Sequence, residues 1–157
     1  MIYLAGRRGQ TMKALVVFDS TWGNTEKIAH AVASGIGGGT KAHRVGAIES
    51  KRFETIDLLV LGSPILGGRP SPAMHEYINS IPEAAAKKLR VATFDTRLMM
   101  RFAKIFGYAA VRMADQLKDK GCTLRSTEGF FVKGRSGPLA DGELVRATEW
   151  GNKLSRS

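Results

Sequence analysis

Short apolar runs separated by helical repeats dominate the pattern of the chain. Ala14–Phe18 and Asp57–Gly62 are too short for helices and have no polar alternation, so each predicts a strand buried on both faces of a sheet. Leu89–Phe94 predicts another strand, Lys41–Ile48 a weaker one at a sheet edge, and Gly129–Val132, with some residues before it, a last one.

Apolar residues recur at helical spacing between these runs. Thr25–Ile36 predicts a first helix, which Gly37–Gly39 ends because glycine takes the left-handed geometry of a C-cap. Ser71 and Pro72 predict the cap and the first position of a second helix. The inner face of that helix is expected to consist of Met74, Tyr77, Ile78 and Ile81.

Two further helices are predicted towards the C-terminus. Gly121 ends the first of them, and the turn-rich stretch Gly134–Gly142 leads into the second, which is expected to start near Asp141. The first repeats apolar residues at Phe102, Ile105, Phe106, Ala109, Ala110, Met113 and Leu117, and the second at Leu144, Ala147, Trp150 and Leu154.

Five strands that alternate with about four helices predict an α/β fold with a doubly wound parallel sheet and helices on both faces. We expect a single domain over residues 13–157 and a disordered tail over residues 1–12, with Met12 as a candidate natural start. Ligands of such sheets bind at the carboxyl ends of the strands.

The 157 residues carry a net charge of +10, which favours an acidic partner. The basic residues are dispersed, so no specific nucleic-acid site is predicted. Cys122 is the only cysteine, and we expect it to be a small buried residue. We expect the protein to be cytoplasmic. No apolar run is long enough to span a membrane, and MIYLAGRRGQ is a poor signal peptide. The scattered His30, His43 and His75 are expected at surface or packing positions, and no metal site is predicted.

Three polar loops are expected at one rim of the sheet, over Asp19–Asn24, Ser63–Pro72 and Asp95–Arg101. The first joins a buried strand to a helix, so hydroxyls, backbone N–H groups and the positive helix end meet there, and a phosphate is the simplest ligand. The glycine fingerprint of dinucleotide sites and the Gly-Lys-Ser/Thr loop of nucleotide-triphosphate sites are both absent. No catalytic carboxylate pair or Ser-His-Asp set can be placed.

The stretch Asp19–Ala29, DSTWGNTEKIA, resembles the loop with which flavodoxins bind the phosphate of flavin mononucleotide (FMN), usually Ser/Thr-x-Thr-Gly-x-Thr. Trp22 replaces the middle threonine, and an aromatic residue there is similar to the flavodoxin domains of flavo-diiron proteins. Gly62–Arg69, GSPILGGR, resembles the second flavodoxin loop, usually Gly-Thr/Ser-Pro-Thr-Tyr-Gly.

This resemblance covers Lys13–Leu154 and implies a flavodoxin-like sheet of order 2-1-3-4-5 with FMN as cofactor. It implies that hydroxyls and backbone N–H groups of the first loop hold the phosphate, and that Gly67 and Gly68 let the backbone approach the flavin ring. The cofactor-binding set that it implies is Ser20, Thr21, Trp22, Gly23, Asn24, Thr25, Ser63, Pro64, Ile65, Leu66, Gly67, Gly68, Asp95, Thr96 and Arg97.

The chain departs from the flavodoxin pattern at the expected ring site. Leu66 stands at the aromatic place of the second loop, and the third loop has an unusual sequence, in which Met99, Met100 or Phe102 either covers one face of the ring or begins a core helix. Arg97 stabilises the reduced flavin, holds an acidic substrate or partner, is exposed and solvated, or pairs with Asp95. Arg69 is expected to be exposed and solvated.

The resemblance implies an FMN-binding electron-transfer protein that works with a redox partner protein, either a reductase or an acceptor. An FMN-dependent NAD(P)H:quinone-type reductase is the enzymatic alternative, although no separate nicotinamide site is visible. The missing ring aromatics motivate a third interpretation, a flavodoxin-fold interaction module that has lost flavin.

Overall fold

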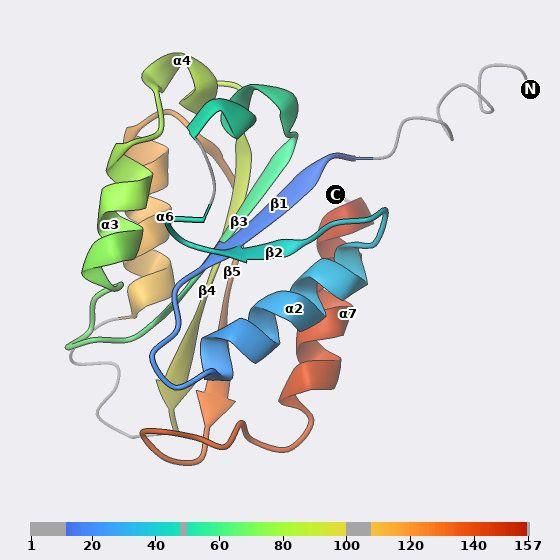
Figure 1. The fold of residues 1–157 in the computed structure, drawn as a ribbon, viewed down its shortest axis with the longest axis vertical. Helices are drawn as coiled ribbons and strands as arrows, with labels where there is room; N and C mark the ends of the chain where they lie inside the picture. Colours follow the sequence, from blue (N-terminus) through green and yellow to red (C-terminus); the bar gives the residue numbers. More distant parts are fainter. Residues whose placement is uncertain (1–11, 48–49, 100–107, 157) are drawn as a thin grey trace, which may run out of the picture.

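The computed structural model describes residues 12–47, 50–99 and 108–156, and within them five strands form one parallel sheet. The strand order is β2-β1-β3-β4-β5, and every neighbouring pair is parallel (Figure 1). This order confirms the predicted doubly wound α/β fold. The strands are β1 Ala14–Phe18, β2 Ala42–Arg44, β3 Leu58–Pro64, β4 Arg90–Leu98 and β5 Thr123–Val132.

Helices cover both faces of the sheet, with α2 and α7 on one face and α3 and α6 on the other (Figure 1). Their bounds, with the short helix α4 and the 3-10 helix η1, are α2 Asn24–Ile36, η1 Ser50–Thr55, α3 Pro72–Asn79, α4 Glu83–Ala86, α6 Ala109–Asp119 and α7 Glu143–Arg156. No helix in these described parts is long and apolar enough to cross a membrane.

Each face of the sheet has its own apolar cluster. Leu15 and Val17 of β1 pack with α3 and α6, whereas Val16 and Phe18 pack with α2 and α7. Successive side chains of a strand point to opposite faces, so a strand between two helical layers needs apolar residues at every position. The prediction that Ala14–Phe18 is a strand buried on both faces is therefore confirmed.

The helix ends follow the predicted local chemistry. Gly37 takes a φ of 75° at the end of α2, and its N–H donates to the Ala33 carbonyl at 3.1 Å. At the start of α3 the Ser71 hydroxyl accepts the Met74 N–H at 3.3 Å, with Pro72 at the first helical position. Met74, Tyr77 and Ile78 of α3 are buried as predicted, and Ile81 is also buried but lies just after the helix ends.

Two strands run further than predicted, which moves the start of two rim loops. Ser63 and Pro64 still belong to β3, where they pair with Asp95 and Thr96, and β4 continues to Leu98. The ladder to β5 holds this polar end of β4 in strand geometry, because Arg97 pairs with Phe131. The prediction that the third loop begins at Asp95 is therefore wrong.

The C-terminal elements also differ in extent from the prediction. β5 begins at Thr123 and alternates exposed and half-buried residues before Gly129, as expected of the edge strand of a sheet. α7 begins at Glu143, and of the apolar residues that predicted it, Leu144 is 46% exposed, whereas Ala147, Trp150 and Leu154 are buried. Of the residues expected in the preceding helix, Phe102, Ile105 and Phe106 lie outside the described residues.

The cysteine and the histidines have structural positions, as predicted. Cys122 is buried in the cluster under α6, and burial raises the pKa of its thiol. His30 is exposed beside Glu26, His43 is half-buried, and His75 is exposed with hydrogen bonds to Asn79 and Gln116. No group of three or more metal-ligating side chains occurs among the residues described.

Candidate functional site

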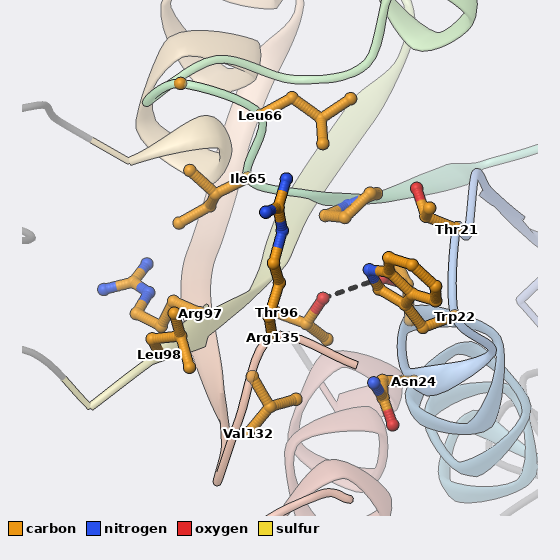
Figure 2. A pocket seen from close by; sticks show the side chains of 13 residues that line it. Thr21, Trp22, Asn24, Ile65, Leu66, Thr96, Arg97, Leu98, Val132 and Arg135 are labelled. Atoms are coloured by element: carbon orange, nitrogen blue, oxygen red, sulfur yellow. Dashed lines mark hydrogen bonds between the residues drawn. The ribbon is translucent and has the colours of Figure 1, made fainter. Parts of the chain in front are cut away.

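A cavity of about 510 Å³ opens at the carboxyl ends of the strands (Figure 2). Its size lies in the range of sites for small molecules and cofactors. β1, β3, β4 and β5 all contribute, either through their last residues or through the loops that follow. The predicted site residues that line it are Thr21, Trp22, Asn24, Thr25, Pro64, Ile65, Leu66, Gly67, Thr96 and Arg97.

The other predicted residues do not line the cavity, and three of them shape its walls through hydrogen bonds. The Ser20 hydroxyl accepts the Gly23 N–H at 2.9 Å and so closes the first loop. The Ser63 hydroxyl accepts the Ser71 N–H at 2.9 Å, which ties the end of β3 to the start of α3. Asp95 is fully buried behind the surface, and Gly68 belongs to the turn described below.

The N-terminus of α2 offers backbone donors at one end of the cavity. The first bond of the helical pattern runs from the Lys27 N–H to the Gly23 carbonyl at 3.1 Å. Within the described residues, the N–H groups of Asn24, Thr25 and Glu26 have no hydrogen-bond acceptor, and no side chain caps the helix. Free donors and the positive end of the helix dipole together make this an anion-binding position.

Two buried hydroxyls lie beside these donors. Thr25 Oγ1 and Thr96 Oγ1 are 2.8 Å apart and hydrogen-bonded, and the two residues are 1% and 7% exposed. The dashed line that begins at Thr96 in Figure 2 marks this bond. Each hydroxyl has one proton, so the pair uses one proton internally and keeps one for a third acceptor. The contact joins the end of β4 to the start of α2 and gives the anion position a fixed neutral donor.

A tight turn shapes the second loop. Leu66 and Arg69 exchange backbone hydrogen bonds of 2.8 and 3.1 Å around Gly67 and Gly68, whose φ values are 59° and 79°. Such a two-residue turn needs positive φ at both central positions, which glycine adopts without strain. The turn places Ile65 and Leu66 at the cavity, and it leaves Arg69 exposed, as predicted.

The cavity has a largely aliphatic wall. Trp22, 57% exposed, is the only aromatic residue among the described residues that line it, and Leu66 is 45% exposed. Met99 is 69% exposed and is not among the residues that line the cavity. Met100 and Phe102 lie outside the described residues.

Arg97 forms an ion pair with the buried Asp95. Its Nε and Nη2 donate to the two carboxylate oxygens of Asp95 at 2.6 and 2.9 Å, and the Ala110 N–H donates to the same carboxylate at 2.9 Å. The guanidinium lies 3.6 Å from the centre of the Tyr108 ring, and a Cβ at Gly129 would overlap with it. Burial raises the pKa of Asp95, while Arg97 and the Ala110 N–H oppose this. The predicted pairing of Arg97 with Asp95 is therefore confirmed, and Arg97 also lines the cavity.

Arg135 is a cavity residue that sequence reasoning missed, together with Leu98 and Val132. It follows β5 at the same rim, and it is exposed. The rule that ligands lie at the carboxyl ends of parallel strands applies equally to the loop after β5, where Arg135 stands between Gly134 and Gly137. The same rule therefore identifies Arg135 as a candidate cavity residue.

Glu143 anchors the start of α7 to β5, close to that loop. Its carboxylate accepts the Phe131 N–H at 2.7 Å and the Arg146 Nε–H at 2.9 Å. These bonds, led by those from Arg146, hold the pKa of Glu143 below its usual value. A depressed pKa contributes stability that is present above the unfolded-state pKa of 4.5 and is lost as the pH falls through the folded-state pKa.

We expect Glu143→Gln to lower the free energy of unfolding at neutral pH by about 1 kcal/mol and to make it less sensitive to acid below the unfolded-state pKa. Urea unfolding at several pH values measures both effects. Glu149→Gln, on the exposed side of the same helix, is the control. If the free energies of unfolding of Glu143→Gln and of the wild type fall equally as the pH is lowered, Glu143 is not the source of the acid sensitivity.

The matches to known proteins agree with this geometry. A family model described as a flavodoxin domain matches residues 15–134, most of the chain. The chain belongs to the flavodoxin family. No curated protein sequence matches it.

Solved structures of known proteins share the fold. A flavodoxin from an archaeon superposes with a TM-score of 0.74 at 18% identity, covering 92% of this chain and 97% of that one. The two-electron reduced flavodoxin of Megasphaera elsdenii gives 0.72 at 17% identity, covering 92% and 99%. The Flv1 flavodiiron core from Synechocystis sp. PCC6803 gives 0.71 at 19% identity and covers 99% of this chain but 38% of its own.

Proposed function

We propose that this flavodoxin binds FMN in the rim cavity and transfers electrons between redox partner proteins. The observation that carries the proposal is the anion position at the start of α2, where free backbone N–H groups lie beside the Thr25–Thr96 hydroxyl pair. Bound flavin would supply the capacity to accept and release electrons. The chain's own residues would bind and orient it.

The residues at the cavity fit FMN in two respects. The phosphate requires fixed donors, and the first loop supplies neutral ones from backbone and hydroxyl groups. The ring requires an apolar slot, and Trp22, Ile65 and Leu66 line the remainder of the cavity. The absence of a dinucleotide glycine fingerprint favours the mononucleotide.

Charge and cysteine content support the remaining parts of the proposal. The net charge of +10 favours an acidic redox partner, whose approach it would accelerate at low ionic strength. A cytoplasmic location is supported by a single cysteine that is buried and free.

Purification and titration test the proposal directly. The protein should be yellow, or the colourless apoprotein should quench the fluorescence of added FMN with saturation. Riboflavin, which lacks the phosphate, should bind more weakly. A colourless protein that leaves FMN fluorescence unchanged would overturn the proposal in favour of an interaction module without flavin.

A second assay separates a carrier from an enzyme. The FMN-loaded protein is mixed with NADH or NADPH and a quinone, with no other reductase present. A carrier should give no turnover until a separate reductase is added. Turnover by the protein alone would establish the NAD(P)H:quinone-type reductase instead.

We expect Thr25→Val to weaken FMN binding about 10- to 100-fold, because a hydrogen bond to a charged group contributes about 1.5–3 kcal/mol. Riboflavin binding should be unchanged. Fluorescence-quenching titrations measure both. Thr93→Val is the matched control, since the Thr93 hydroxyl is also buried but donates to the Ala110 carbonyl, away from the cavity. Equal losses of FMN and riboflavin affinity would remove Thr25 from the phosphate position.

A further inference from the structure

Arg135 reaches into the cavity from the loop after β5. Figure 2 shows its side chain extending from that loop toward Ile65 and Leu66. The Arg97 guanidinium lies apart from the Arg135 side chain, at the left of the view and lower than Ile65. Thr21 and Asn24, which flank the anion position, lie on the other side of the view. The cation is thus directed at the second loop and not at the phosphate end.

The loop that carries Arg135 is built to hold it in place. The Lys133 N–H donates to the Pro138 carbonyl at 2.8 Å, and the Gly137 N–H donates to the Gly134 carbonyl at 3.0 Å. Arg135 therefore occupies the first central position of a hydrogen-bonded turn. A bridge between Val132 and Leu139 closes the base of this small hairpin.

The same hairpin packs against the start of α2. Gly137 has a φ of 106°, and a Cβ added there would lie 2.7 Å from Asn24 Oδ1. Only glycine satisfies both the left-handed conformation and this close approach. Asn24, itself 7% exposed, thereby fixes the hairpin relative to the anion position.

The charge of Arg135 is not neutralised within the described residues. In the part of the chain that the structure describes, no hydrogen bond or ion pair involves Arg135, and the aspartates near the rim have other partners. Asp95 binds Arg97, Asp19 lies 3.6 Å from Arg44, and Asp141 lies 3.1 Å from Lys133. Among the described lining residues, the cavity thus contains a cation that no protein anion matches, beside a largely apolar wall.

We propose that Arg135 is a positioning contact to the ring of the bound flavin and favours the reduced, negatively charged cofactor over the oxidised one. The proposal rests on FMN binding as proposed above. Reduction adds two electrons and one proton to the neutral ring and leaves one net negative charge on it, with no bond formed to the protein. A guanidinium beside the ring lowers the free energy of that anion more than that of the neutral form.

The test compares Arg135→Gln, Arg135→Lys and Arg125→Gln in the full chain. Arg125 is exposed near the start of β5, at the opposite end of the strand from the cavity, so Arg125→Gln changes the net charge equally without touching the site. Binding of oxidised FMN and riboflavin is measured by fluorescence quenching. The two-electron midpoint potential is measured by anaerobic reduction with dithionite against a reference dye.

We expect Arg135→Gln to weaken binding of reduced flavin about tenfold relative to oxidised flavin, which equals about 30 mV toward more negative midpoint potential. Arg135→Lys should retain most of the wild-type value, and Arg125→Gln all of it. Equal shifts for Arg135→Gln and Arg125→Gln would reduce Arg135 to a contribution to net charge and overturn the proposal.

Two other results have separate meanings. If Arg135→Gln weakens FMN but not riboflavin and leaves the potential unchanged, Arg135 contacts the phosphate, and its assignment to the ring is wrong. If the wild-type protein binds neither ligand, the proposed function fails, and the assignment of Arg135 fails with it.

Discussion

Arg97→Met is expected to lower the free energy of unfolding by about 3–5 kcal/mol, the cost of removing one partner of a buried ion pair. Asp95 is 0% exposed, and Arg97 supplies two of the hydrogen bonds that compensate its charge. Without the guanidinium, only the Ala110 N–H remains within the described residues. Urea unfolding of the apoprotein, followed by circular dichroism, measures the loss.

The pH dependence of the same variant identifies the cause. Burial already raises the pKa of Asp95, and loss of Arg97 removes two influences that lower it. A group with a raised folded-state pKa costs stability as the pH rises through that pKa. The loss in Arg97→Met should therefore be smaller at acidic than at neutral pH, and Asp95→Asn combined with Arg97→Met should recover part of it. A loss under about 1 kcal/mol at neutral pH would contradict this account.

Gly151→Ala is expected to cost about 3 kcal/mol through overpacking between α2 and α7. A Cβ at Gly151 would overlap with the Val32 carbonyl oxygen, and one at Gly35 on the facing helix would overlap with the Thr148 carbonyl oxygen. Both obstacles are backbone atoms, so the helices themselves must separate. The higher helix propensity of alanine, about 1 kcal/mol over glycine, offsets only part of the cost.

Thermal and urea unfolding measure this effect. Asn152→Ala, the exposed neighbour on the same helix, is the matched control and should change stability by less than about 0.5 kcal/mol. A Gly151→Ala protein as stable as Asn152→Ala would show that the two helices can separate freely at this point.

The elements that were predicted well are those whose type and bounds depend on residues close together in the sequence. β1 lies between two helical layers, so its unbroken apolar run has one interpretation, and α3 begins where the Ser71–Pro72 pair indicates. The fold followed from the alternation of such elements. Anion-binding geometry at the start of α2 could also be expected, because it depends on a strand, a short loop and a helix that are adjacent in sequence.

The parts that sequence could not give depend on contacts between distant residues. Asp95 continues β4 because β5 supplies the ladder and Arg97 compensates its charge, and neither is visible from the local pattern. The pairing of Thr25 with Thr96 joins positions 71 residues apart. The strand-end rule alone places Arg135 at the rim, but the position of its loop beside the start of α2 depends on the close approach of Gly137 to Asn24, which lie far apart in the sequence.

The placement of the two tryptophans gives the chain two separate optical reporters. Trp22 lies at the mouth of the cavity and is 57% exposed, while Trp150 is 6% exposed and its indole N–H donates to the Ser126 hydroxyl at 3.0 Å. A ligand in the cavity would therefore act first on the emission of Trp22, whereas unfolding would act mainly on that of Trp150. One fluorescence spectrum, compared with that of a Trp22→Phe protein, distinguishes occupancy of the site from integrity of the core.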